Sequence, residues 1–185
     1  MPQVLCDWLL SIKANAILKA EILTKIKDSV MQKGEKLVFS DIVEMMLTPS
    51  KLIHTLYINT DLLDTIKALS AQKHTIVLIG NFDMESLALL KSKFQEAFSY
   101  IDLVVVSGDI KQLKPSKDFY HEALTKIQNF LGLSEAINPE ECINFETEQK
   151  FIAEAKAEKM QVITCNDKTD KKYFKQQLAQ RGIIV

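Results

Sequence analysis

Between residues 60 and 185 the sequence alternates between short apolar runs and longer amphipathic stretches, and this alternation constrains the fold more than any other feature. Four short runs are mainly apolar: His74–Ile79, Leu103–Val106, Cys142–Phe145 and Gln161–Thr164. Such runs are typical of strands buried on both faces of a parallel sheet. The stretches between them have helical apolar spacing, which predicts βαβ units with right-handed crossovers. We therefore expect an α/β fold, a Rossmann-like parallel sheet in a three-layer arrangement.

The amphipathic stretches predict the helices that cover this sheet. Thr60, Asp83 and Thr147 are candidate N-terminal caps, because their side-chain oxygens can accept hydrogen bonds from the first helical turn. Further helices are expected over three ranges: Phe119–Leu131, Glu148–Glu158 and Asp170–Gln180. The last residues, Gly182–Val185, are expected to extend the sheet edge beyond the fourth apolar run.

The first third of the chain has a different character. From Trp8 to about Tyr57 the apolar residues follow the helical period, with no β-rich run. A second amphipathic stretch, Asp41–Leu47, stops at Pro49. We therefore expect a helical module over residues 1–60 and an α/β domain over residues 61–185.

Composition excludes several classes of function. Lys+Arg 23 against Asp+Glu 24 gives a formal net charge of -1, so no overall field favours nucleic acid or a membrane surface. Cys6, Cys142 and Cys165 are widely spaced without a CxxC pair, which favours reduced thiols over disulfides or a zinc site. The apolar runs are far shorter than the ~20 residues that span a bilayer. We expect a cytoplasmic protein with no membrane or nucleic-acid partner.

Polar segments follow three of the predicted strands, at the sheet edge where α/β proteins bind ligands. They are Gly80–Asp83, the block from Ser107-Gly108 through Lys114-Pro115 to Phe119-Tyr120, and Phe145–Thr147. The motifs in these segments and their spacing resemble those of the haloacid dehalogenase-like (HAD) superfamily of phosphatases and dehalogenases. The resemblance covers about residues 62–164. By this resemblance the helical module over residues 1–60 is the cap that the family often inserts after its first strand.

The resemblance implies a hydrolase chemistry in which an aspartate attacks the substrate and water cleaves the covalent intermediate. In the family an Asp-x-Asp pair supplies the nucleophile and the acid/base, and acids near the fourth strand help to hold Mg²⁺. Lys114 matches the catalytic lysine that offsets the charge of nucleophile and phosphate. With Gly80 and Asn81 it forms the expected phosphate-binding set, and Glu146 is the candidate metal ligand.

The sequence departs from the family pattern at three places. Gly80 stands where the family has a Ser or Thr, so the hydroxyl donor is absent. Glu146-Thr147 replaces the usual acidic pair. The Asp-x-Asp strand, expected before the cap, is not found. Asp7 is the candidate nucleophile because it ends a short apolar run, but Leu9 occupies the second-acid position, and Asp7 also suits a surface acid or N-cap of the first helix.

The missing strand belongs between the strands at His74–Ile79 and Cys142–Phe145. Without it two rows of backbone groups lack partners, at a cost of about 1–3 kcal/mol for each group. We expect the two halves of the sheet to slide together. A strand donated by a second chain, or entry of a terminal segment (Val4–Leu5 or Ile183–Val185), are the alternatives in that order.

Three functions remain open from the sequence. The favoured hypothesis is a HAD-like protein that is catalytically impaired or inactive and keeps at most a site for a small anionic or phosphorylated ligand. The first alternative is an active Mg²⁺-dependent phosphate-ester hydrolase that uses Asp7 or an upstream acid. The second is an interaction protein that forms a homo-oligomer through an open sheet edge.

Overall fold

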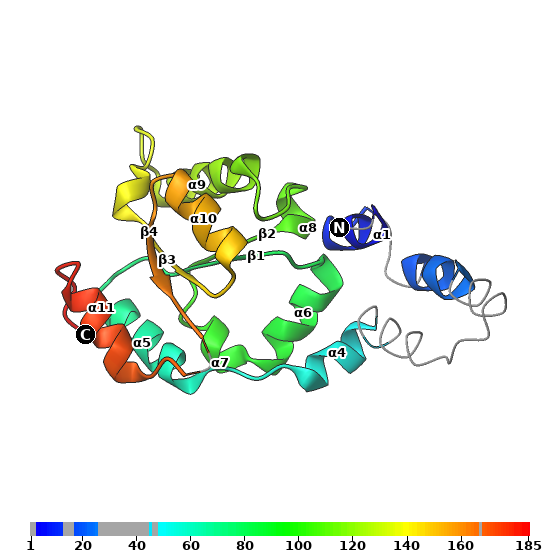
Figure 1. Ribbon diagram of the computed structural model, residues 1–185, viewed down its shortest axis with the longest axis horizontal. Coiled ribbons are helices and arrows are strands. Elements are labelled where there is room, and N and C mark those ends of the chain that lie inside the picture. The colour runs from blue at the N-terminus through cyan, green and yellow to red at the C-terminus, as the bar shows by residue number, and fades with distance from the viewer. Residues whose placement is uncertain (1–2, 13–16, 26–44, 46–47, 167) are drawn as a thin grey trace. The chain divides into compact units, whose positions relative to one another are not determined.

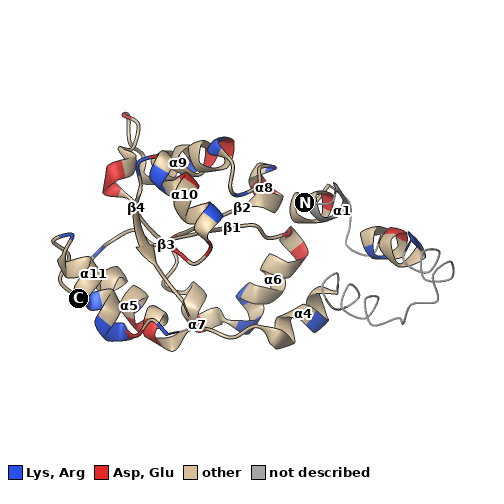
Figure 2. Ribbon diagram, viewed as in Figure 1, with Lys and Arg blue, Asp and Glu red and all other residues tan. Residues whose placement is uncertain are grey.

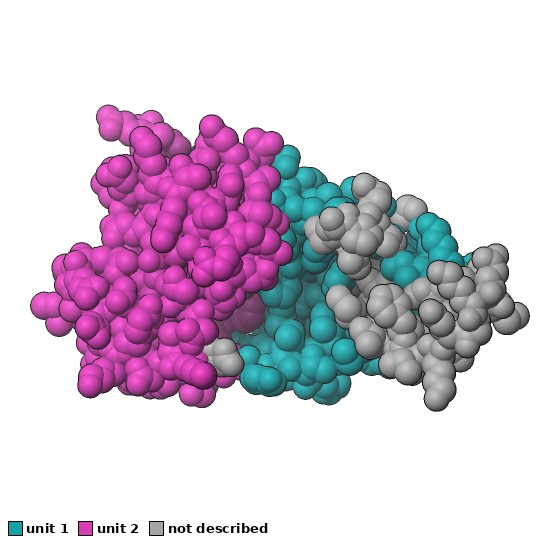
Figure 3. Space-filling model, in the orientation of Figure 1, with its two compact units in different colours: residues 1–57, 81–95, 106–113 teal, residues 58–80, 96–105, 114–185 magenta. Residues whose placement is uncertain are grey.

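The computed structural model of the chain describes residues 3–12, 17–25, 45, 48–166 and 168–185. Its residue contacts divide the chain into two compact units, each assembled from separate stretches of sequence (Figure 3). Unit 1 comprises Met1–Tyr57, Asn81–Gln95 and Val106–Leu113. Unit 2 comprises Ile58–Gly80, Glu96–Val105 and Lys114–Val185. The boundary near residue 60 between a cap and an α/β domain stays a prediction.

Helices and strands alternate along the chain from residue 60 onward (Figure 1). The strands are β1 (Val77–Gly80), β2 (Leu103–Val106), β3 (Ile143–Glu146) and β4 (Gln161–Thr164). The helices with defined bounds are α1 (Gln3–Leu9), α4 (Pro49–Thr55), α5 (Thr60–Ala71), α6 (Met84–Lys93), α7 (Gln95–Phe98), α8 (Ser107–Ile110), α9 (Lys117–Leu131), α10 (Gln149–Ala157) and α11 (Lys171–Ala179), with a 3-10 turn η1 (Pro139–Glu141). The α/β fold is confirmed, and β2 and β4 have the predicted bounds.

Within the part of the chain that the structure describes, the four strands form two separate two-stranded sheets, β1 with β2 and β3 with β4. β3 and β4 run parallel, with Phe145 opposite Ile163 and Glu146 opposite Thr164. No strand pairing joins β1 to β3 in these sheets. The prediction that the two halves slide together is therefore wrong, and β1 and β3 each have a strand neighbour on one side.

The terminal segments do not form the missing strand. Val4–Leu5 lies inside α1, and Ile183–Val185 is not assigned to a strand, so the expected extension of the sheet edge is wrong. The side chains of Ile183 and Val185 instead pack against the core beside β4 and α11. The Ile184 carbonyl accepts a hydrogen bond from Gln72 Nε2 at 2.6 Å, which holds the C-terminal residues beside α5.

The apolar side chains of β1 and β3 are less completely buried than the most buried side chains of β2 and β4. Val105 and Val106 in β2 are 0% and 1% exposed, and Ile163 in β4 is 0% exposed. The apolar side chains of β1 and β3 are all partly exposed: Val77, Leu78, Ile79, Ile143 and Phe145. Inner strands of a sheet covered on both faces are ordinarily the most buried. The partial exposure of the apolar side chains on β1 and β3 fits strands that each lack one neighbour.

An apolar core of unit 2 lies around β4. It consists of five buried residues: Leu69, Ile163, Cys165, Phe174 and Leu178. The helices α5 and α11 contact each other, and α10 contacts both β3 and β4. Because burying each large apolar side chain contributes about 1.5–3 kcal/mol, these contacts fix the β3–β4 pair and the residues at its carboxyl end.

Side-chain caps set the beginnings of the helices. Asp83 is confirmed as the cap of α6, because its Oδ1 accepts from the backbone N–H groups of Glu85 and Ser86. Asn59, rather than Thr60, caps α5, and its Oδ1 accepts from Leu62 N–H at 3.0 Å. The expectation for Thr60 is therefore wrong by one residue.

The described N-terminal residues of unit 1 are helical, as predicted, over α1, residues 17–25 and α4. Trp8, Leu18 and Ile22 form a small buried cluster. The predicted amphipathic stretch Asp41–Leu47 lies outside the described residues except for Met45.

Two residues of the block after β2 hold the C-terminal end of α1. The Ser107 hydroxyl donates to the Leu9 carbonyl at 2.6 Å, and Lys111 Nζ donates to the Leu10 carbonyl at 2.7 Å. These bonds satisfy carbonyl groups that have no partner within a helix. Part of the Ser107–Tyr120 block thus has a structural task in unit 1 that the sequence did not indicate.

Charges of both signs mix along α9 and α10, as expected for a chain with little net charge (Figure 2). Among the described residues, no helix combines the length and apolar character that crossing a membrane requires.

Candidate functional site

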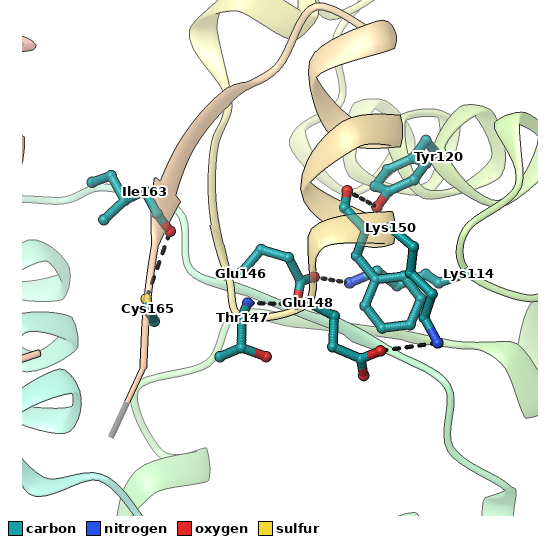
Figure 4. A network of polar contacts seen from close by, with 9 residues as sticks. Lys114, Tyr120, Glu146, Thr147, Glu148, Lys150, Ile163 and Cys165 are labelled. Carbon is teal, nitrogen blue, oxygen red and sulfur yellow. Dashed lines mark hydrogen bonds and ion pairs between the residues drawn. The ribbon is translucent and has the colours of Figure 1, made fainter. Parts of the chain in front are cut away.

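The candidate site is built on a buried ion pair in unit 2 between Lys114 and Glu146. Lys114 lies between α8 and α9, and Glu146 is the last residue of β3. Lys114 Nζ contacts Glu146 Oε2, and the two side chains are only 6% and 9% exposed (Figure 4). Because unpaired charges are costly to bury, each of these groups requires the other in this position.

The rest of the Glu146 residue is also engaged. Its second carboxylate oxygen, Oε1, accepts a hydrogen bond from the Thr147 backbone N–H at 2.8 Å. Its carbonyl accepts from the Cys165 N–H at 2.7 Å, which continues the pairing of β3 with the chain after β4. Both carboxylate oxygens therefore have a donor.

An aromatic side chain, that of Phe151, lies beside the lysine end of the pair. Lys114 Nζ lies 4.7 Å from the centroid of the Phe151 ring, a cation–π distance. The Tyr120 hydroxyl donates to the Phe151 carbonyl at 3.3 Å, which ties α9 to α10. The ring of Phe151 also lies beside Lys150, which pairs with Glu148 at the surface (Figure 4). Glu148 is the N-cap of α10 without a side-chain bond, so the expected cap at Thr147 is wrong.

The negative charge of Glu146 affects two neighbouring acids. Burial, and then the charge of Glu146, raises the pKa of the Tyr120 phenol above its ordinary value. Burial, followed by the same charge, raises the pKa of the Cys165 thiol to about 11. Both groups stay protonated near pH 7, so Cys165 has the character of a structural thiol and not of a nucleophile.

Asn144 is a residue that the sequence did not single out. It lies two positions before Glu146 on β3, so the two side chains emerge on the same face of the strand. Asn144 is 8% exposed, and no hydrogen-bond partner of its Nδ2 is found within the described structure. A buried amide donor without a partner is uncommon in folded proteins and indicates a place where an acceptor can bind. An Asn in an otherwise apolar strand was the available signal.

The other predicted site residues divide between the two units. Gly80 ends β1 and belongs with Lys114 to unit 2, whereas Asn81 and Asp7 belong to unit 1. Asp7 lies within α1, so it does not end a strand as the candidate nucleophile would. In a helix its backbone carbonyl accepts from Ile12 N–H, and the side chain has no strand end from which to act. Of the predicted site residues, Lys114 and Glu146 are in direct contact.

The residues that the structure describes do not fit a resident Mg²⁺ ion. Magnesium requires several oxygen ligands in near-octahedral geometry. Across the described part of the chain, no cluster of three His, Cys, Asp or Glu side chains could hold a metal ion. Glu146, the expected ligand, has a lysine ammonium on one oxygen and an N–H donor on the other. Its role in this arrangement is that of a partner for Lys114.

Solved structures share this arrangement of elements. A predicted HAD-like family hydrolase from Porphyromonas gingivalis matches with a TM-score of 0.68 and 16% identity, over 96% of this chain and 78% of that chain. A HAD family enzyme from Bacteroides thetaiotaomicron matches with a TM-score of 0.62 and 16% identity, over 93% and 77% of the two chains. This chain has the HAD-like fold.

A complex of that Bacteroides enzyme with magnesium and inorganic phosphate also matches, with a TM-score of 0.59 and 16% identity over 91% of this chain and 77% of that chain. No protein-family model and no curated protein sequence matches this chain. The HAD-like fold is therefore established by the backbone, and at 16% identity the assignment of individual residues to roles depends on this chain's own geometry.

Proposed function

We propose that this chain is a HAD-like protein that has lost hydrolysis and keeps an anion-binding site centred on Lys114. The observation that carries the proposal is the buried Lys114–Glu146 pair, which places a cation at the carboxyl end of β3. A lysine ammonium offers charge-assisted hydrogen bonds to phosphate or a similar anion. The Bacteroides enzyme of the same fold was crystallised with inorganic phosphate, which supports this class of ligand.

Binding by this chain would use donors but no nucleophile. Lys114 supplies the positive charge, and the unused Asn144 Nδ2 is a neutral donor on the same face of β3 as Glu146. Covalent catalysis additionally requires an activated carboxylate, and the location of Asp7 inside α1 does not favour that role.

A turnover assay tests the loss of hydrolysis. Purified protein with Mg²⁺ should release no phosphate above the buffer rate from a panel of phosphomonoesters. The alternative of an active hydrolase predicts saturable turnover that disappears in the Asp7→Asn variant. That result would refute the proposal and identify Asp7 as the nucleophile.

A thermal-shift titration tests the anion site. Inorganic phosphate should raise the melting temperature by mass action. The Lys114→Ala variant should lose this increase, while Lys117→Ala, three residues away on the exposed start of α9, should keep it. The Lys117 control also corrects for the general stabilisation that phosphate gives to folded proteins. Equal shifts in the two variants would exclude Lys114 from the site.

A second candidate function is self-association through the edges of β1 and β3. The half-exposed apolar side chains on these strands, and the lack of a pairing between them, favour a second copy that adds a strand there. Sedimentation should then give a dimer or larger species. Leu78→Lys on β1 should dissociate it, whereas Val104→Lys on β2 should not. A wild-type monomer at high micromolar concentration would contradict this candidate.

A further inference from the structure

We infer that Glu146 is an internal competitor for the anion site, which it occupies through Lys114 until an anion displaces it. The inference depends on the proposed function, because it concerns the same lysine. A metal ligand at this position would raise the affinity for phosphate through the bound metal. As a competitor for Lys114, Glu146 would instead lower that affinity.

The geometry of the pair supports competition. Glu146 Oε2 contacts the Lys114 ammonium directly, and the Phe151 ring lies 4.7 Å from the same nitrogen. An anion that contacts Lys114 Nζ would lie beside the Glu146 carboxylate. Both side chains are more than nine-tenths buried, so the repulsion between the two negative charges would be only weakly screened. An anion and the Glu146 carboxylate therefore cannot both use this ammonium at full strength.

The attachment of Glu146 allows such a displacement. Its side chain is held by Lys114 and by the Thr147 N–H of the adjacent residue, and it projects from the last position of β3. The chain leaves the strand at this point, before α10 begins at Gln149. The carboxylate can thus change rotamer without a change in the pairing of β3 with β4.

Phosphate titrations of four variants test the inference. The charge-neutral Glu146→Gln variant should bind inorganic phosphate at least ~10-fold more tightly than the wild type by calorimetry, because one charge-assisted hydrogen bond no longer competes for Lys114. Glu148→Gln, which removes an exposed carboxylate two residues away, should bind like the wild type. Lys114→Ala and the double variant Lys114→Ala/Glu146→Gln should not bind. These measurements need no Mg²⁺, and its addition should not change them.

The outcomes separate the inference from the proposed function. If Lys114→Ala abolishes binding but Glu146→Gln binds phosphate equally or more weakly than the wild type, the competition is refuted and the anion site stands. If the wild type and Lys114→Ala both bind phosphate with equal affinity, the anion site at Lys114 fails and the inference fails with it. Tight binding by Glu146→Gln alone, with none in the wild type, supports the inference in its strongest form.

A measurement on the wild type covers the case in which Glu146→Gln does not fold. The Thr147 amide donates to Glu146 Oε1 at 2.8 Å and so reports on the carboxylate. Phosphate should shift the amide proton resonance of Thr147 in the wild type, to an extent that follows the binding curve, and should not shift it in Lys114→Ala. A Thr147 resonance that stays in place while phosphate saturates Lys114 would refute the displacement of Glu146.

Discussion

At the scale of single residues, the Lys114–Glu146 pair is where sequence and structure agree in part. The Lys114-Pro115 motif identified Lys114, and the turn after the third predicted strand identified Glu146. The sequence assigned Lys114 to phosphate binding and Glu146 to metal binding, so it did not predict that they form a pair. Their direct contact joins positions 32 residues apart, and no local pattern predicts it. Asn144 carried a local signal, as an Asn in an otherwise apolar strand, but its burial without a partner for Nδ2 depends on packing and not on sequence spacing.

Removal of one member of the pair should strongly destabilise the protein. Lys114→Met should lower the free energy of unfolding by about 3–5 kcal/mol, because it leaves Glu146 charged and buried without its partner. The double variant Lys114→Met/Glu146→Leu should recover most of the loss. Urea denaturation measures both, with Lys150→Met as the control.

Lys150 is a suitable control because its pair with Glu148 is exposed, with side chains at 60% and 55%. Exposed pairs contribute about 0–1 kcal/mol. If Lys114→Met loses no more unfolding free energy than Lys150→Met, the stabilising role of the buried pair is contradicted.

The thiol of Cys165 should make stability depend on pH in the alkaline range. Its pKa is raised from 9.0 to about 11 in the folded protein, so the folded state holds its proton more firmly than the unfolded state. This contribution is complete below pH 9 and is lost as the pH rises toward 11. Between pH 9 and 11 the unfolding free energy of Cys165→Ala should therefore fall less steeply than that of the wild type. If the unfolding free energies of the two proteins fall in parallel between pH 9 and 11, the pKa of Cys165 is not raised in the folded protein.

At the scale of helices and strands, the sequence was most informative after residue 60. The four strands follow from continuous apolar runs, and the start of α6 follows from the Asp83 cap, because both signals are local. The caps of α5 and α10 were each misplaced by one residue, since neighbouring polar residues compete for the position. The division into two sheets could not be read from the sequence, because pairing between strands depends on contacts distant in the chain.

The Asp83 cap offers a direct test of these local rules. Asp83→Ala should destabilise the protein by about 1 kcal/mol, because the N–H groups of Glu85 and Ser86 lose their acceptor. Asp83→Asn should retain most of the stability, since an amide oxygen can accept the same bonds. Thermal unfolding of both variants and of Glu85→Ala, an exposed neighbour, checks this. Equal losses in the Ala and Asn variants would point to a role of the charge instead of the cap.

At the scale of the whole molecule, the chain passes between its two units at five places: 57/58, 80/81, 95/96, 105/106 and 113/114. The division into a helical cap over residues 1–60 and an α/β domain over residues 61–185 stays a prediction. The sequence pattern predicts that residues 81–95 and 106–113 belong to βαβ units. Their local structure is helical, but in the structure they group with the N-terminal residues of unit 1. Which surface a helix packs against is a tertiary property that periodicity alone leaves open.

A fragment of residues 58–185 should therefore be less stable than the full chain. The fragment would lack α4, which packs on α6. Leu87 and Leu90 of α6, which are buried in the intact protein at 4% and 9% exposure, would then become accessible to solvent. Lys93, which donates to the carbonyls of Ile53 and Leu56, would also lose its acceptors. We expect a lower melting temperature and binding of a hydrophobic dye. An unchanged melting temperature would show that residues 58–185 fold independently.

The bond from Ser107 to the Leu9 carbonyl also sets an order of events during synthesis. These two residues are separated by 98 positions. At about 5–20 residues per second, the ribosome makes Ser107 roughly 5–20 s after Leu9. During that interval the end of α1 has neither the Ser107 hydroxyl nor the Lys111 ammonium that later holds it. The end of α1 thus obtains this hydrogen bond only after 98 further positions have been synthesised, and Trp8 is available during that interval to a chaperone that binds nascent apolar segments.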